Sequence, residues 1–150
     1  MIYSSNERGE NMLNQSIIVG RLTKNAEITL TAKGKQKTSF TLAVNRSYKN
    51  EKGEVPVDFI DCILWGKQAE IFVQYTCKGA LMGVMGEIHK NKYEKDGQVR
   101  YYTILNCKSF QFIEPKTVIQ ERMEKQGLSA VLKETGGEIP MDIVEDDLPF

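Results

Sequence analysis

Hydrophobic and polar residues alternate along much of the chain up to residue 113, as they do in β-strands with one buried face. The segment "KTSFTLAVNRSY" places Phe40, Leu42 and Val44 on one parity. The segment "NQSIIVGRLTKNAEITLT" is also rich in strand-forming residues and contains a turn-like "TKNAE". The segment "VDFIDCILW" has two apolar faces, one with Ile60, Cys62 and Leu64 and the other with Phe59, Ile63 and Trp65. These patterns predict three strands.

Two further long strands are predicted for "GALMGVMGEIHKNKYE" and "QVRYYTILNCKSFQFI", which are joined by "KDG", a hairpin turn signal. A helix is predicted for "KQAEIFVQYTC", because Ala69, Phe72 and Val73 have helical spacing and Gly79 lies just beyond. Three strands, a helix and two strands follow the order of an OB-fold. The sequence therefore predicts an all-β fold, a five-stranded antiparallel OB-fold barrel with one helix between strands 3 and 4.

The character of the sequence changes near each end of the predicted barrel. After residue 113 the chain becomes mostly polar, and "TVIQERMEKQGLSAVLKE" is at most weakly helical. We interpret this part as a mobile linker that leads to an acidic C-terminal tail. We interpret Met12 as the natural start, so that residues 1–11 are either a mis-assigned upstream extension or a disordered arm. The predicted parts are a disordered extension (1–11), the OB-fold domain (12–113), the linker (114–141) and the acidic tip (142–150).

Charge is distributed unevenly, although the formal net charge of the whole chain is zero. Residues 12–113 hold fifteen Lys and Arg against nine Asp and Glu, a net charge of +6. Residues 114–150 hold four against nine, a net charge of −5. A basic body with an acidic tail is typical of nucleic-acid-binding proteins that carry an interaction tail.

The three cysteines follow no metal-ligand spacing, and we interpret them as reduced thiols of a cytoplasmic protein. No run of about 18 apolar residues predicts a membrane span. His89, the one histidine, has no nucleophile in a recognisable motif beside it, so we interpret it as a solvated side chain. Asp58 and Asp61 lie three apart on a predicted strand and therefore face opposite sides. We expect no enzyme activity, no metal and no cofactor.

Aromatic and basic residues instead fit a site for single-stranded nucleic acid, which needs rings for base stacking and cations along the phosphates. Tyr48 begins the polar loop "YKNEKGE", and Tyr93 lies among lysines in "HKNKYEKDG". Phe59 and Trp65 share a strand face. Burial in a core or a subunit contact is the alternative for all four rings, although less so for Tyr48 and Tyr93, which polar residues surround. Asp61 lies on that same face, where it would repel phosphate.

Several segments together resemble the bacterial single-stranded DNA-binding protein family. They are "MLNQSIIVGRLTKNAEI", "FTLAVNRSYKNEKGE", "DFIDCILWGKQAE", "YTCKGALMGVMGEIHKNKYEKDG" and the terminal "EDDLPF". The resemblance runs in order from Met12 to about Ile113 and returns at the tip. It implies an OB-fold that assembles as a homotetramer and binds single-stranded DNA without strong sequence preference, during DNA replication, recombination and repair.

The resemblance also implies roles for individual residues. The residues implied in base stacking are Tyr48, Phe59, Trp65 and Tyr93, of which all except Trp65 are Trp in several family members. The residues implied in phosphate binding are Arg21, Arg46, Lys49, Lys67, Lys78 and Lys92, to which charge alone adds Lys90 and Arg100. The linker departs from the family pattern, because it is short and lacks a glycine- and glutamine-rich stretch. This departure puts linker-mediated clustering on DNA in doubt.

The acidic tip is implied to be the docking peptide for replication, recombination and repair enzymes. Phe150 offers a ring and the terminal carboxylate to a pocket with a basic rim, and Asp146 and Asp147 add attraction to that rim. Leu148 completes the apolar end, and Pro149 lowers the ordering cost. The same tip is expected to compete with phosphate for the basic barrel. A merely solubilising tail is the alternative.

Three other functions remain open on the sequence. The first is an OB-fold adaptor whose main ligand is RNA or a protein, although such adaptors usually lack an acidic tip. The second is a nuclease on an OB barrel, which would need clustered carboxylates. The third is a structural oligomer whose aromatic residues join subunits. With the family reading, the protein is expected in the bacterial cytoplasm, associated with the nucleoid.

Overall fold

The structure is a computed structural model that describes residues 11–127. The expected N-terminal extension up to residue 10 and the acidic tip lie outside the described residues. The elements are β1 (Ser16–Leu22), β2 (Thr29–Leu30), β3 (Gln36–Asn45), β4 (Val57–Trp65), α1 (Lys67–Tyr75), β5 (Leu81–Lys95), β6 (Gln98–Phe112) and α2 (Lys116–Lys125).

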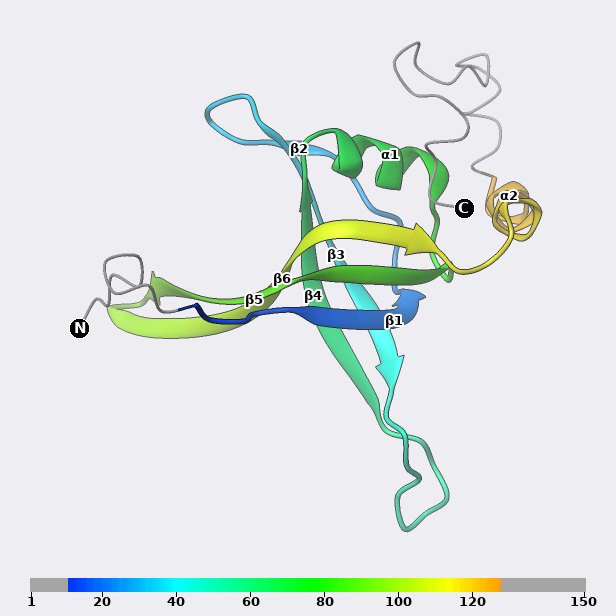
Figure 1. Ribbon diagram of the computed structural model, residues 1–150, viewed down its shortest axis with the longest axis horizontal. Coiled ribbons are helices and arrows are strands. Elements are labelled where there is room, and N and C mark those ends of the chain that lie inside the picture. Colours follow the sequence, from blue (N-terminus) through cyan, green and yellow to red (C-terminus); the bar gives the residue numbers. More distant parts are fainter. Residues whose placement is uncertain (1–10, 128–150) are drawn as a thin grey trace.

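The strands form one sheet in the order β1-β5-β6-β4-β3-β2, which a further pairing of β1 with β3 closes into a barrel (Figure 1). Helix α1 lies between β4 and β5, which are the third and fourth long strands. The predicted OB-fold is therefore confirmed. One pairing differs from the antiparallel expectation, because β4 and β6 run parallel where Cys62 lies opposite Leu105.

The barrel interior is filled by alternate residues of β3 and β4, as the sequence pattern predicts. Phe40 and Leu42 of β3 and Leu64 of β4 are buried. Phe72 of α1 stacks on Phe40, with ring centroids 4.3 Å apart, and closes one end of the barrel. Because these side chains point inward, the odd-numbered positions of β4 are left on the outer face.

The hairpin of β5 and β6 extends beyond the barrel as a long two-stranded arm (Figure 1). Its two-residue turn has φ of 54° at Asp96 and 77° at Gly97, the positive values that a type I′ turn requires. Where the arm joins the barrel, a register shift falls between Met85 and Gly86. A Cβ at Gly86 would lie 2.1 Å from the carbonyl oxygen of Asn106, so only glycine fits there.

Helix α2 lies within the segment for which the sequence analysis expects a mobile linker. Its Ile119 and Met123 are buried in the hydrophobic core, so the folded body continues past residue 113. Glu114, just before α2, bonds Arg21 of β1 and Arg122 of α2, each at 2.8 Å. The helix was difficult to predict because only its i, i+4 pair is buried in an otherwise polar segment.

Candidate nucleic-acid interface

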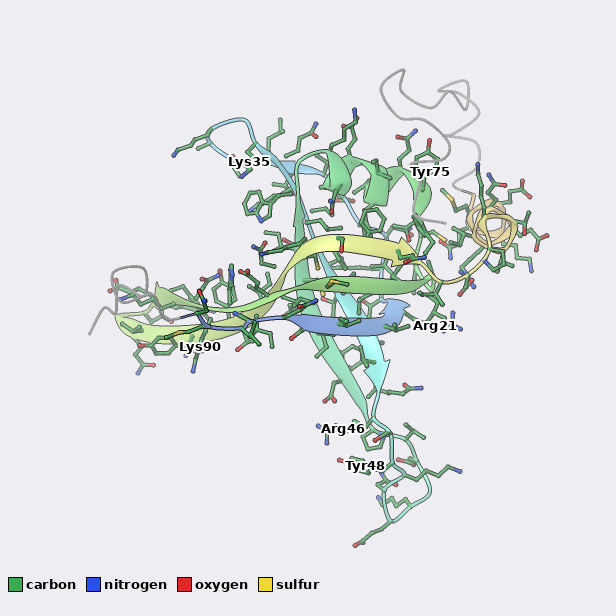
Figure 2. The ribbon with its side chains drawn as sticks, viewed as in Figure 1. Arg21, Lys35, Arg46, Tyr48, Tyr75 and Lys90 are labelled. Atoms are coloured by element: carbon green, nitrogen blue, oxygen red, sulfur yellow. The ribbon has the colours of Figure 1, made fainter. Side chains whose placement is uncertain are left out.

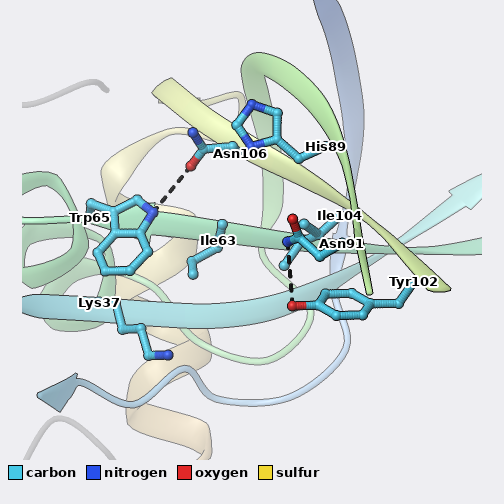
Figure 3. Close-up of a pocket in the computed structure, with 8 residues that line it drawn as sticks. All are labelled: Lys37, Ile63, Trp65, His89, Asn91, Tyr102, Ile104 and Asn106. Atoms are coloured by element: carbon cyan, nitrogen blue, oxygen red, sulfur yellow. Dashed lines mark hydrogen bonds between the residues drawn. The ribbon is translucent and has the colours of Figure 1, made fainter. Parts of the chain in front are cut away.

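A groove runs over the outer face of the barrel, between β4 and the base of the β5–β6 arm (Figure 3). It contains a hollow of about 320 Å³ that combines aromatic, amide and basic side chains. The lining residues are Lys37, Ile63, Trp65, His89, Asn91, Tyr102, Ile104 and Asn106. The hollow therefore combines apolar and polar side chains, which suits a flat ring with polar edges.

Trp65 lies in this groove rather than in the core. Its indole Nε1 donates a hydrogen bond to Oδ1 of Asn106 at 3.2 Å, which holds one edge of the ring (Figure 3). The Nζ atoms of Lys35 and Lys37 lie 4.9 and 5.8 Å from the ring centroid. Such distances are within the range of cation–π attraction. The arrangement places a stacking surface and two cations at one point.

Four of the predicted residues lie on the β5–β6 arm. Tyr93 is 43% exposed and pairs across the strands with Arg100, and Lys90 and Lys92 are exposed on the same arm. The arm thus combines a ring with three cations. The sequence shows that basic residues surround Tyr93. That Arg100 joins them on the same arm follows only from the pairing of β5 with β6 in the structure.

Two tyrosines of the arm were missed by the sequence analysis. The ring of Tyr102 lies 5.8 Å from that of Tyr93, and its hydroxyl accepts a hydrogen bond from Nδ2 of Asn91 at 3.3 Å. Lys90 Nζ lies 5.4 Å from the ring centroid of Tyr101. The pair "YY" in the predicted strand could have revealed them. Adjacent residues of a strand point to opposite faces, so two neighbouring tyrosines cannot both face the core.

Arg46 and Tyr48 lie where β3 leads into the loop before β4, and they are linked (Figure 2). Arg46 forms two hydrogen bonds of 2.9 Å with the carboxylate of Asp58, and its Nη1 donates to the Tyr48 hydroxyl at 2.8 Å. The bonds with Asp58 and with Tyr48 raise the pKa of Arg46, and the bond from Arg46 lowers the pKa of Asp58. The guanidinium therefore orients Tyr48 and is neutralised by Asp58.

The remaining residues of this region are exposed. Phe59 lies opposite Ala43 on the outer face of β4 and is 67% exposed, and Lys49 is exposed in the loop that Tyr48 begins. Neither is in the core, so the alternative of burial for Phe59 would need a second molecule. Tyr48, which is 55% exposed, shares this property.

Arg21 lies near α2, at the end of the barrel away from the arm (Figure 2), and Lys78 lies near the end of α2. Arg21 Nη1 donates to the carbonyl oxygen of Gly79 at 2.9 Å and forms the ion pair with Glu114 described above. The carbonyl oxygen of Lys78 accepts a hydrogen bond from Nε2 of Gln126, the residue that follows α2. Lys67, which is exposed, begins α1 two residues after Trp65. The predicted basic residues therefore do not form one continuous surface.

Other titratable groups have structural partners. His89 Nε2 lies 3.1 Å from Oε2 of Glu87. Cys62, Cys77 and Cys107 are free and buried, and burial raises the pKa of Cys77. Within residues 11–127, no group of three or more His, Cys, Asp or Glu side chains is arranged to hold a metal ion. In that same range, no helix is long and apolar enough to cross a membrane.

Comparisons with known proteins agree on one family. The sequence model of the Single-strand binding protein family matches residues 13–113. The chain is 41% identical over 139 residues to Single-stranded DNA-binding protein 1 of Streptococcus pyogenes, which covers 93% of this chain and 100% of that protein. It is 42% identical over 112 residues to the Single-stranded DNA-binding protein of Enterococcus faecalis, which covers 74% of this chain and 60% of that protein.

A solved structure supports the fold. The Plasmodium falciparum SSB in complex with ssDNA superposes with a TM-score of 0.62, over 70% of this chain and 98% of that chain. The two sequences are 20% identical, so this likeness concerns the arrangement of the strands.

Proposed function

This chain belongs to the single-strand binding protein family, and from that premise we propose that it binds single-stranded DNA without strong sequence preference. Family membership places the chain among DNA-binding proteins rather than enzymes. We propose that it acts in DNA replication, recombination and repair, in the bacterial cytoplasm and in association with the nucleoid.

The groove at Trp65 is the observation that carries this proposal. The indole ring is held by Asn106 and lies within about 6 Å of two lysine ammonium groups, so one base and its phosphates would meet a ring and cations together. Stacking on such a ring contributes about 1–3 kcal/mol per base and is insensitive to which base it is. Tyr93 and Tyr102 continue the ring surface onto the arm.

Discrimination against duplex follows from the same chemistry. Paired bases keep their faces inside the stack, so the rings of Trp65 and Tyr93 gain nothing from a duplex. Release of counterions from the phosphates by lysine and arginine makes the affinity fall with salt, by about 0.7 log units per phosphate contact for each log unit of salt.

We further propose assembly as a homotetramer, in which several barrels bind one strand and the later contacts become intramolecular. Exposed apolar residues on the outer face of β1 and β5 support contact with a second copy. Ile17 is 68% exposed, Val19 is 47% exposed and Met85, which lies opposite Ile17, is 38% exposed. We also propose that the acidic tip is a docking peptide for genome-maintenance enzymes.

The test is fluorescence anisotropy of labelled oligo(dT) with the full chain, at low and high salt and with duplex as competitor. We expect tight binding that salt weakens and that duplex does not compete away. The double variant Trp65→Ala with Tyr93→Ala should weaken binding at least about tenfold, because two stacking contacts are lost.

The control for this double variant is Val118→Ala, which changes an exposed side chain of α2 away from the groove. Unfolding curves of all three proteins check that the barrel is intact. Unchanged affinity in the folded double variant would refute the stacking assignment, and absence of binding by the parent protein at low salt would refute the proposed function.

A further inference from the structure

Asp61 is a carboxylate in the middle of the proposed stacking face. It lies on the outer face of β4 between Phe59 and Ile63, each about 7 Å away along the strand. Its Oδ1 accepts a hydrogen bond from the Thr41 hydroxyl at 2.9 Å, across the β3–β4 pair. Among the described residues it has no ion pair with Lys or Arg. A negative charge with no cation bound to it repels phosphates and would weaken DNA binding. A carboxylate at this position is therefore unexpected unless it contacts another part of the nucleotide.

A second hollow, of about 270 Å³, opens beside this carboxylate. Tyr102 and Ile104 of β6 line both this hollow and the groove at Trp65, so the two lie side by side. The other side chains that matter are Asp61, Thr41 and Lys24. The hollow therefore offers a ring, an acceptor that Thr41 orients, and one cation.

Cytosine and adenine differ from thymine and uracil in the group that such an acceptor would meet. An ionised carboxylate only accepts hydrogen bonds. Cytosine presents an amino group at C4, and adenine presents one at C6, whereas thymine and uracil present a carbonyl oxygen at C4. A carboxylate accepts from the amino group of cytosine and repels the carbonyl oxygen of uracil or thymine.

We propose that the hollow at Asp61 is a base-reading subsite, which favours a base with an exocyclic amino group, cytosine above all, over uracil or thymine. The inference rests on the proposed single-stranded DNA binding and adds a base preference at one position of the strand. Tyr102 stacks on the base, Asp61 accepts from its amino group, and Lys24 lies near enough to the same hollow to attract the adjoining phosphate.

The experiment compares oligo(dC) with oligo(dU) of the same length, for the full chain and for Asp61→Asn. These two strands share their backbone, and their bases differ only in the amino or carbonyl group at C4 and the proton at N3. The quantity measured is the ratio Kd(dU)/Kd(dC) at one salt concentration. Asparagine keeps an acceptor but adds a donor, so it accommodates either base. We expect the ratio to fall about three- to tenfold in Asp61→Asn.

The control is Glu121→Gln, which removes one negative charge from the exposed face of α2 and should leave the ratio unchanged. If Asp61 only repels phosphate, Asp61→Asn will tighten binding of both strands equally and leave the ratio constant, which overturns the inference while the proposed function stands. If the parent protein binds neither strand, the proposed function fails and the subsite fails with it. A higher ratio Kd(dU)/Kd(dC) in Asp61→Asn than in the parent protein would also overturn the inference.

Discussion

The link from Asp58 through Arg46 to Tyr48 leads to a prediction that separates two roles for Arg46. The family resemblance implies that Arg46 binds phosphate, but its guanidinium is already bonded to Asp58 at 2.9 Å and to the Tyr48 hydroxyl at 2.8 Å. We expect Arg46 to act as a positioning residue that holds the Tyr48 ring ready for a base. Asp58→Asn removes the charge that fixes Arg46 and leaves the tyrosine itself chemically unchanged.

The size of the effect follows from the ordering of one side chain. Without the link, Tyr48 must be immobilised when the base binds, and this ordering lowers affinity about two- to tenfold. If Arg46 instead binds phosphate, the effect on affinity is reversed: a guanidinium released from Asp58 and free to bind phosphate would tighten DNA binding. It would also steepen the dependence of log Kd on log salt by about 0.7.

Titrations of labelled oligo(dT) at several salt concentrations measure both quantities. We expect Asp58→Asn to weaken binding with an unchanged salt slope, and Glu121→Gln to leave both unchanged. Tyr48→Phe keeps the ring but removes the hydroxyl, so Asp58→Asn should have little further effect in that background. Tighter binding with a steeper salt slope in Asp58→Asn would show that Arg46 is a phosphate ligand held in reserve, and would refute the positioning role.

Two further predictions concern the end of the barrel at α2. Ile119→Ala should lower the free energy of unfolding by about 2–5 kcal/mol, measured in urea at fixed protein concentration, whereas Val118→Ala should lower it by less than about 0.5 kcal/mol. Equal effects would mean that α2 does not pack on the core in solution. Burial raises the pKa of Glu114, but bonds from Arg122 and Arg21 outweigh it and lower the pKa overall. This stabilisation is present above the ordinary pKa of a glutamate and is lost as pH falls through the lowered value. The free energy of unfolding of Glu114→Gln should therefore fall less steeply at acid pH than that of the parent protein. The same steepness in both proteins would contradict this prediction.

The strands and the arm could be predicted because their signals are local. Phe40 and Leu42 reveal β3 since every second side chain of the strand faces the core. The "KDG" signal reveals the arm because Asp96 and Gly97 tolerate the positive φ that the tight turn requires. Both features depend on residues that are neighbours in the chain, so no knowledge of the tertiary structure was needed.

The pairing of charged residues could not be predicted in the same way. Arg21 meets Glu114, 93 residues further along, only because β1 and the end of β6 lie at one end of the barrel. A count of basic residues therefore includes Arg21 and Arg46 as free cations, whereas both are paired. Tyr102 was missed for a related reason: its place in the groove depends on the register of β6 against β5 and β4.

The closure of the barrel has a consequence for how the chain folds as it is synthesised. Ser16 of β1 pairs with Gly86 of β5, seventy residues later, and Cys62 of β4 pairs with Leu105 of β6, which is also synthesised much later. Until β6 is available, β4 and β5 each carry an unpaired edge, and the core has no complete wall. Folding dominated by such long-range pairings is slow, in the range of milliseconds to seconds. The nascent chain thus exposes strand edges to aggregation until nearly all of the described residues have been made.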